Sequence, residues 1–232
     1  MFGQINTLVK QAMETFTCRK EFFQQNIEIL KTLMDKITSN DVRLNPALLS
    51  HSIWEKPNKA PATYVDIYQD DVITLGIFVL KPGMILPLHD HPDMHGLIKV
   101  LFGKIRITSY SVNSENTAAF ESKSSTRIPS YLKPYLVVEK TSEITADSSN
   151  NCCVLYPEFE NLHEIESIGG PAAFMDILSP PYETTDENGE IRRCNYYKVL
   201  SELAPNIFKL QKIDSPSDFW TDSAPFIGKL SI

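Results

Sequence analysis

Residues 83–103 read GMILPLHDHPDMHGLIKVLFG, and this stretch predicts both the fold and the chemistry of the chain. Side chains alternate between the two faces of a strand. If this stretch forms a strand, His89 and His91 therefore point to the same side of it. Two imidazoles at that separation can hold a single metal ion. The chain has five histidines, and His163, further along the sequence, is the candidate for a third ligand. A metal site is therefore the first hypothesis.

Composition limits the classes of partner. The chain has 232 residues and a net charge of -7 at pH 7. Nucleic acids and anionic membrane surfaces need a basic protein surface, so we expect no nucleic-acid partner and no membrane contact. No stretch approaches the roughly 20 apolar residues of a membrane span, and the first residues lack a secretory signal. A cytoplasmic location follows as the expectation.

The apolar pattern changes character near residue 64. Residues 6–37 carry apolar side chains at helical spacing, which predicts one or two helices with a turn near 17–19. Short strands are predicted after that point, and polar turns separate them. They are residues 72–80, 97–101, 105–108, 135–138, 153–156 and 172–178. This spacing favours a sandwich or barrel over alternating strands and helices.

The polar stretches and the tail complete the predicted organisation. Residues 113–130 and 141–151 are rich in Ser, Thr, Asn and Glu and are predicted to be exposed loops. Residues 203–232 are predicted to wrap the surface and to pack through their aromatic side chains. We expect residues 1–60 to form a helical segment packed on a barrel of residues 61–232, as one structural domain overall.

The spacing of glycines and histidines in residues 83–103 resembles the first sequence motif of cupins. Five residues separate Gly83 from His89, four separate His91 from Gly96, and six separate Gly96 from Gly103. Cupins carry a glutamate where this chain has Gly96, and the second cupin motif is only loosely matched around His163. The resemblance implies a mainly β fold, the cupin double-stranded β-helix or jelly-roll barrel, preceded by N-terminal α-helices.

The missing glutamate narrows the chemistry. A common non-haem iron site uses two histidines and one carboxylate and keeps open positions. A third imidazole in place of the carboxylate raises the net charge of the site by one, which favours an anionic ligand such as a thiolate. Three histidines, two donors from an aminothiol and one O2 would fill six positions. Zinc or manganese could occupy three histidines just as easily on spacing alone.

Longer stretches resemble the 2-aminoethanethiol (cysteamine) dioxygenases, a cupin thiol dioxygenase family that includes the plant cysteine oxidases. The resemblance spans about residues 83–200, and its most specific stretches are 86–103, 161–165, 170–182 and 194–200. It implies one Fe(II) per chain on His89, His91 and His163, with O2 as co-substrate.

The resemblance also implies the reaction and the substrates. Both oxygen atoms of O2 add to a thiol and give a sulfinic acid. The substrates are a small aminothiol, as in the conversion of cysteamine to hypotaurine, and/or proteins with an N-terminal cysteine, whose oxidation feeds oxygen-dependent degradation. We expect a monomer, because no association stripe stands out in the sequence.

Four more residues are candidates for roles near the metal. Asp176 could hydrogen-bond an amine, a water or a ligand imidazole, or serve the structure alone. The Tyr196 hydroxyl could orient dioxygen, or the ring could pack in the core. Cys194 shares a face with Tyr196 if the segment is a strand, and a thioether link between them is conceivable. His95 is either a ligand or a residue that lies behind the ligands or in the core.

Two other functional classes compete with the dioxygenase. One is a different metal-dependent cupin enzyme, such as a zinc or manganese isomerase, and Gly96 weighs against those that need the glutamate. The other is a non-catalytic cupin binding module. Such modules often lose ligands, whereas all three histidines are present here. The choice between a small thiol and a peptide substrate stays open.

Overall fold

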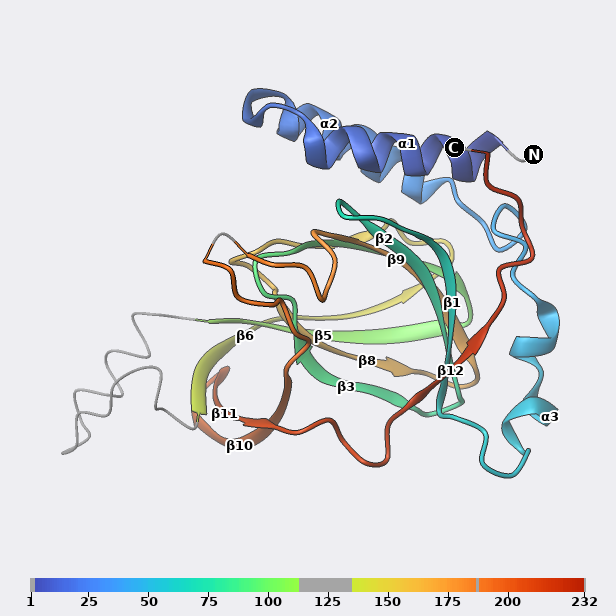
Figure 1. Cartoon of the computed structure of the whole chain (residues 1–232). Helices are drawn as coiled ribbons and strands as arrows, with labels where there is room; N and C mark the ends of the chain where they lie inside the picture. Colours follow the sequence, from blue (N-terminus) through green and yellow to red (C-terminus); the bar gives the residue numbers. More distant parts are fainter. Residues whose placement is uncertain (1–2, 113–134, 187, 232) are drawn as a thin grey trace.

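The computed structural model describes residues 3–112, 135–186 and 188–231 of the chain. Strands dominate this part, and they form two sheets that enclose a common interior with a pair of helices lying across the outside (Figure 1). The mainly β jelly-roll fold predicted from the cupin resemblance is confirmed. The predicted loop at 113–130 lies outside the described residues.

One sheet has six strands in the order β12-β1-β2-β9-β4-β7. Its strands are β1 (Ala62–Gln69), β2 (Thr74–Leu80), β4 (His95–Phe102), β7 (Cys153–Leu155), β9 (Ala172–Ser179) and β12 (Thr221–Ala224). Pairing is antiparallel except between β1 and β12, which run parallel. The C-terminal segment therefore adds the edge strand of a sheet built mainly from the middle of the chain.

The other strands close into a barrel in the order β10-β11-β6-β5-β8-β3. They are β3 (Ile85–Asp90), β5 (Lys104–Val112), β6 (Tyr135–Asp147), β8 (Leu162–Ser167), β10 (Tyr196–Ala204) and β11 (Ile207–Ile213). The predicted pair of strands around Gly103 is confirmed as β4 and β5. Gly103 turns the chain with φ +71°, and a Cβ there would approach the Pro171 carbonyl oxygen to 2.4 Å, so only glycine fits.

Strand β9 shows how the interior is divided. Its residues alternate, so that Met175 and Ile177 pack toward the helices while Phe174 packs toward the space between the sheets. Asp176 and Leu178 share the inward face with Phe174, and all three line a cavity there. The period of two therefore places one carboxylate between the two sheets, on a strand whose only other polar residue is Ser179.

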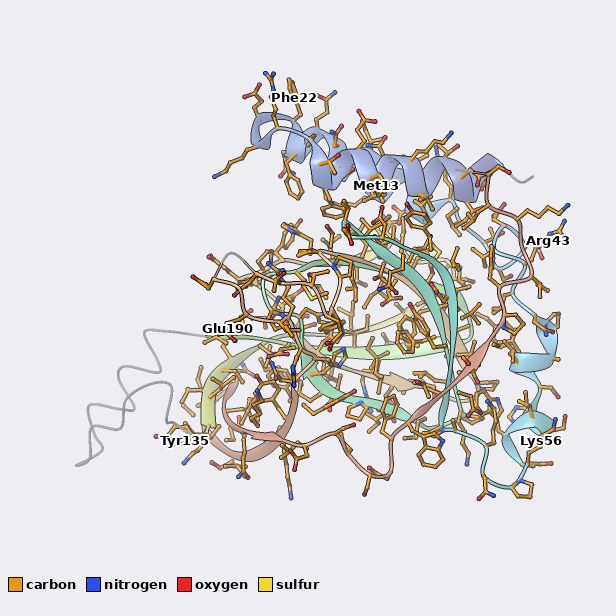
Figure 2. The ribbon with its side chains drawn as sticks, in the orientation of Figure 1. Met13, Phe22, Arg43, Lys56, Tyr135 and Glu190 are labelled. Atoms are coloured by element: carbon orange, nitrogen blue, oxygen red, sulfur yellow. The ribbon has the colours of Figure 1, made fainter. Side chains whose placement is uncertain are left out.

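Two helices cover the outer face of the six-stranded sheet. The predicted helical region is α1 (Gly3–Thr17) and α2 (Lys20–Asp35), with the break at the predicted turn. Their buried side chains, among them Leu8 and Leu30, join one apolar cluster with the outward residues of β2 and β9. Figure 2 shows Met13 directed toward the sheet and Phe22 directed away from it at the far end of the helix pair. Short helices η1 (Pro46–Leu49) and α3 (His51–Trp54) lead into β1.

The predicted exposed loop at 141–151 is wrong over most of its length. Residues 141–147 belong to β6 and pair with β5, with Thr145 opposite Arg106 and Ile144 opposite Ile107. Only the turn after Asp147 remains a loop. The polar composition misled the prediction, because the outward face of a half-exposed antiparallel strand is itself polar.

The tail is more regular than predicted. It contains β11 and β12, and of its adjacent aromatic residues Phe219 is buried while Trp220 is 48% exposed. Packing through aromatics is therefore confirmed for Phe219, Phe208 and Phe226, which lie in or against apolar clusters, while Trp220 is largely exposed. Across the described ranges, no helix is long and apolar enough to cross a membrane.

Candidate metal centre

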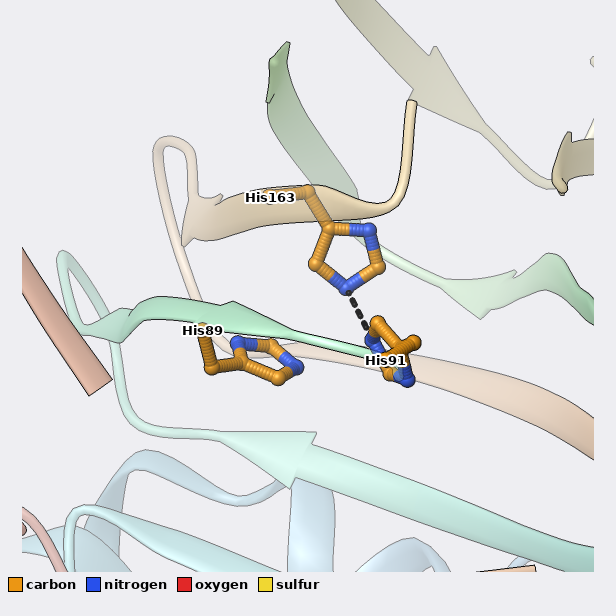
Figure 3. A group of neighbouring side chains, drawn as sticks. All are labelled: His89, His91 and His163. Carbon is orange, nitrogen blue, oxygen red and sulfur yellow. Dashed lines mark hydrogen bonds between the residues drawn. The ribbon is translucent and has the colours of Figure 1, made fainter. Parts of the chain in front are cut away.

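Three histidines converge at the end of the barrel where β3 and β8 meet. His89 on β3 lies directly opposite His163 on β8, and His91 follows just past the end of β3. One nitrogen from each ring lies within 4.8 Å of the others, and the His91 and His163 Nε2 atoms are 3.2 Å apart. Figure 3 shows the three rings turned toward one another. The structure thus brings together the three residues that the sequence singled out.

The opposite ring nitrogens are held by oxygen atoms. His89 Nδ1 lies 2.8 Å from the Pro87 carbonyl oxygen, which can only accept, so Nδ1 carries the proton. The Tyr182 hydroxyl donates to the Asp90 carbonyl oxygen at 2.5 Å and lies 2.8 Å from His91 Nδ1. Its oxygen therefore accepts from His91 Nδ1. Both rings then present an unprotonated Nε2 to the centre of the group, as metal-bound histidines do.

Burial also keeps the imidazoles neutral. Desolvation lowers the pKa of His89, and it lowers the pKa values of His91 and His163 well below the ordinary value. Neighbouring imidazoles lower the latter two further. Neutral imidazole is the form that binds a metal ion. Three neutral imidazoles whose nitrogens converge in a buried site fit a cation, so this donor set suits a metal ion.

Two side chains hold the end of β3 in place. The Asp90 carboxylate accepts from the Asn195 backbone N–H at 2.9 Å and from the Tyr197 hydroxyl at 2.7 Å. On the other side, the Asn161 amide donates to the His91 carbonyl oxygen at 2.6 Å. Sequence reasoning missed these partners and Tyr182. Asp90, between the histidines, was the only one with a local signal, because the others reach the site through the tertiary fold.

Position 96 has no room for the cupin glutamate. A Cβ at Gly96 would lie 2.8 Å from Leu155 Cγ and 3.0 Å from Leu178 Cδ2, so any longer side chain would displace both leucines. Within the part of the chain that the structure describes, the metal-binding group is three histidines without a carboxylate. Its donors are therefore neutral, and a divalent ion would keep its full charge.

A cavity of about 720 Å³ opens onto the histidines. Asp176 lines it and is only 8% exposed, and its Oδ1 has no hydrogen-bond partner. Burial raises the pKa of Asp176 to about 7. A buried carboxylate with an unused acceptor is a ready partner for a cation in the cavity.

Tyr196 and Cys194 also line this cavity. Tyr196 opens β10 opposite His89, with its ring centre 6.4 Å from that imidazole. Burial raises the pKa of Tyr196 to about 12 and that of Cys194 to about 11, and the neighbouring hydroxyl groups of Tyr182 and Tyr196 partly offset the effect on the thiol. Cys194 lies before the first residue of β10. The two side chains therefore line the same cavity without lying on one face of a strand.

His95 lies apart from the histidine group. It opens β4 beneath the helices, with its ring centre 4.9 Å from that of Phe23 and 5.8 Å from that of Phe16. Tyr156 closes the cluster at 5.9 Å. His95 is therefore not part of the histidine group. It packs among aromatic side chains, as the core alternative predicted.

Comparison with known proteins gives a consistent family signal. The PCO_ADO family profile matches residues 33–229. The 2-aminoethanethiol dioxygenase of Homo sapiens is 34% identical over 227 residues, which cover 89% of this chain and 81% of that protein. Plant cysteine oxidase 2 of Arabidopsis thaliana is 31% identical over 202 residues, which cover 82% of this chain and 67% of that protein.

Solved structures overlap this chain less well. A cupin superfamily protein from Desulfitobacterium hafniense shares 11% identity and a TM-score of 0.35, covering 57% of this chain and 89% of that chain. The strand order of the two sheets defines the fold.

Proposed function

The chain belongs to the PCO_ADO family, and from this membership we propose that it is a non-haem Fe(II) thiol dioxygenase. The reaction joins one thiol and one O2 into a sulfinic acid, with both oxygen atoms on sulfur. The observation that carries the proposal is the set of three buried, neutral imidazoles that converge without a carboxylate at the inner end of a cavity. His89, His91 and His163 would hold one iron per chain.

Bound Fe(II) would supply a cationic centre with open positions for a thiolate and O2. The protein's own residues fix and shield that centre. Pro87 and Tyr182 hold the Nδ1 protons, and Asp90 and Asn161 hold the backbone on either side of His91. Because these partners are already in place, the imidazoles need no rearrangement when substrate enters.

The substrate is proposed to carry an amine close to its thiol. Human 2-aminoethanethiol dioxygenase is named for such a small molecule, and the plant relative is named for cysteine. In this chain the products would be hypotaurine from cysteamine and/or cysteine sulfinic acid at a protein N-terminus. The second reaction would make the enzyme an oxygen sensor that marks proteins for degradation. Both substrates present an ammonium group.

Asp176 is the proposed partner of that ammonium group. Asp176 lines the cavity and its buried Oδ1 has no hydrogen-bond partner, so a charged donor that reached it would satisfy it. The Tyr196 hydroxyl lies on the His89 side of the same cavity and is proposed to orient the oxygen that reacts with sulfur. Apolar side chains such as Phe174 and Leu178 line the rest of the wall and exclude water.

The wider setting is part of the same proposal. We expect a cytoplasmic monomer in which residues 1–60 pack on a cupin domain of residues 61–232 within one structural domain. The apolar sides of α1 and α2 support this arrangement, because they pack on the six-stranded sheet.

The test is oxygen consumption by the Fe(II)-loaded protein with two thiols in parallel, cysteamine and a short peptide with an N-terminal cysteine. Mass spectrometry should find a gain of two oxygen atoms. The gain should disappear in His89→Ala and persist in His51→Ala, a control at an exposed histidine in α3. No uptake with iron verified in the site would sink the dioxygenase and favour another metal-dependent cupin enzyme or a binding module.

A further inference from the structure

The cavity is much larger than an aminothiol needs. Its 720 Å³ falls within the range of about 300–1,000 Å³ that holds drug-sized ligands. Cysteamine has only a handful of non-hydrogen atoms and would fill the end next to the histidines and Asp176. The remaining space runs to the surface and is bounded by Glu183, Ser215 and Trp220. A longer substrate is needed to use it.

One wall of this space is the segment of residues 214–222, which we name the C-terminal strap. It connects β11 to β12 and passes along the lower side of the barrel (Figure 1). Its Phe219 is buried against the interior cluster, while Trp220 is half exposed and lines the cavity. The strap therefore presents one large aromatic side chain to whatever leaves the cavity.

The strap is firmly attached at its far end. Lys59 Nζ donates to the Asp222 carboxylate at 2.7 Å and to the Thr63 hydroxyl at 2.6 Å. Thr221 pairs with Ala62 in the parallel register of β12 and β1. These contacts hold the backbone next to Trp220, so the position of its side chain at the cavity is fixed on this side.

Over the described part of the chain, the carboxylate-bearing residues that line the cavity are not matched by basic residues in its lining. Asp176 and Glu183 line the cavity, and among the described residues no lysine or arginine does. On the strap, Asp214 and Asp218 are exposed next to the lining residues Ser215 and Phe219. Carboxylates beside an exposed indole favour a cationic side chain, which gains from both the charge and the ring face.

We infer that the C-terminal strap selects peptide substrates in which a basic side chain closely follows the N-terminal cysteine. This inference rests on the proposed thiol dioxygenase function and deepens it. The cysteine would occupy the end with the histidines, where Asp176 meets its ammonium group. The chain would leave past Trp220, with a lysine or arginine from the next two residues over the ring and near Asp218.

Binding can be measured without turnover. The chain has two tryptophans, so Trp54→Phe leaves Trp220 as the only one. The Fe(II)-loaded variant under nitrogen would be titrated with Cys-Lys-Lys-Gly-Ala and Cys-Glu-Glu-Gly-Ala while Trp220 fluorescence is recorded. We expect the basic peptide to change the emission and to bind about tenfold more tightly than the acidic one.

Matched variants separate the strap from the general acidity of the protein. Trp220→Leu and Asp218→Asn should each reduce the preference by about two- to threefold, read as KM in turnover assays. Phe22→Leu and Glu21→Gln make analogous changes at the far end of the helix pair, where Figure 2 places Phe22 (49% exposed), and should leave the preference intact.

Equal affinity for the two peptides in the wild-type protein, or a preference that neither strap variant reduces, overturns the inference. If the wild-type protein still oxidises cysteamine in that case, the proposed function stands without the strap's role. If iron-loaded wild-type protein oxidises no thiol, the proposed function and the inference fail together.

Discussion

His91 and His95 lie four residues apart in the sequence, yet they belong to different regions of the molecule. His91 faces the cavity, with Tyr182 at its Nδ1 and the His163 Nε2 3.2 Å from its own Nε2. His95 lies under the helices among the rings of Phe16, Phe23 and Tyr156. In both places burial lowers the pKa of the imidazole, so both rings are neutral.

Burial and neutrality therefore do not make a histidine a ligand. The difference lies in what surrounds each ring. His91 has an oxygen acceptor for its Nδ1 and two more imidazoles beside it, whereas His95 is surrounded by aromatic rings. The chain between them changes direction at Asp93, which has φ +57°, and so removes His95 from the face that His89 and His91 share.

Removal of a ring should have the largest effect. We expect His163→Ala to bind iron at least 100-fold more weakly and to lose turnover, since loss of an outer partner alone typically costs 10- to 100-fold. His95→Ala should keep its iron, because no ligand is lost. Iron content after gel filtration and oxygen uptake measure both, and circular dichroism checks the fold. An iron-free His95→Ala protein with intact fold would break the contrast.

The unpaired carboxylate in the cavity should have the next largest effect. The pKa of Asp176 is raised to about 7, so its charge changes across neutral pH. If the charged form binds the substrate ammonium group, kcat/KM for cysteamine should rise as pH increases through about 7. Asp176→Asn should lose this rise and fall between about 10- and 100-fold at pH 8.

Stability should respond in the opposite direction. Because the pKa of Asp176 is raised in the folded protein, the unfolded chain loses this proton at lower pH, and folding becomes less favourable as pH rises from the ordinary value of 3.8 to about 7 and then levels off. Asp176→Asn should therefore have a higher melting temperature than the wild type at pH 8 and a smaller advantage at pH 5. A variant with lower stability at pH 8 would assign Asp176 a structural role.

Much of the centre was predictable because its signals are local. The spacing of His89 and His91 and the alternation around Phe174 follow from strand geometry, and they found two proposed ligands and Asp176. Tyr182 and Asn161 carry no such signal, since their contacts to His91 span 91 and 70 residues. The polar outer face of β6 was mistaken for a loop because composition cannot separate a solvated strand face from a turn.

The hydroxyl behind His91 should have a smaller effect than Asp176. Tyr182→Phe removes the oxygen that accepts from His91 Nδ1 and leaves the ring of Tyr182 in place. We expect iron affinity to fall about tenfold. This is the lower end of the 10- to 100-fold loss typical when a hydrogen-bond partner of a metal ligand is removed. Tyr68→Phe is the matched control, because it also loses a hydroxyl hydrogen bond, to Asp70 in the β1–β2 turn. Equal iron affinity in the two variants would remove Tyr182 from the site.

The smallest effect belongs to the helix-covered region and appears only in stability. Burial lowers the pKa of His95 below 6.5 in the folded protein, so below that pH the unfolded chain binds more protons there. Stability from this group is complete above pH 6.5 and is lost as pH falls toward the folded pKa. His95→Phe cannot titrate, and its ring suits the surrounding aromatic rings.

The drop in melting temperature between pH 7.5 and 5.5 should therefore be about 1–2 °C smaller in His95→Phe than in the wild type, both measured without metal. The three cavity histidines also resist protonation, but they are present in both proteins and cancel in the difference. His51→Phe, at an exposed histidine, should follow the wild type. An unchanged drop in His95→Phe would mean that protons reach His95 without disturbing the helices, and that only the cavity histidines are sensitive to acid.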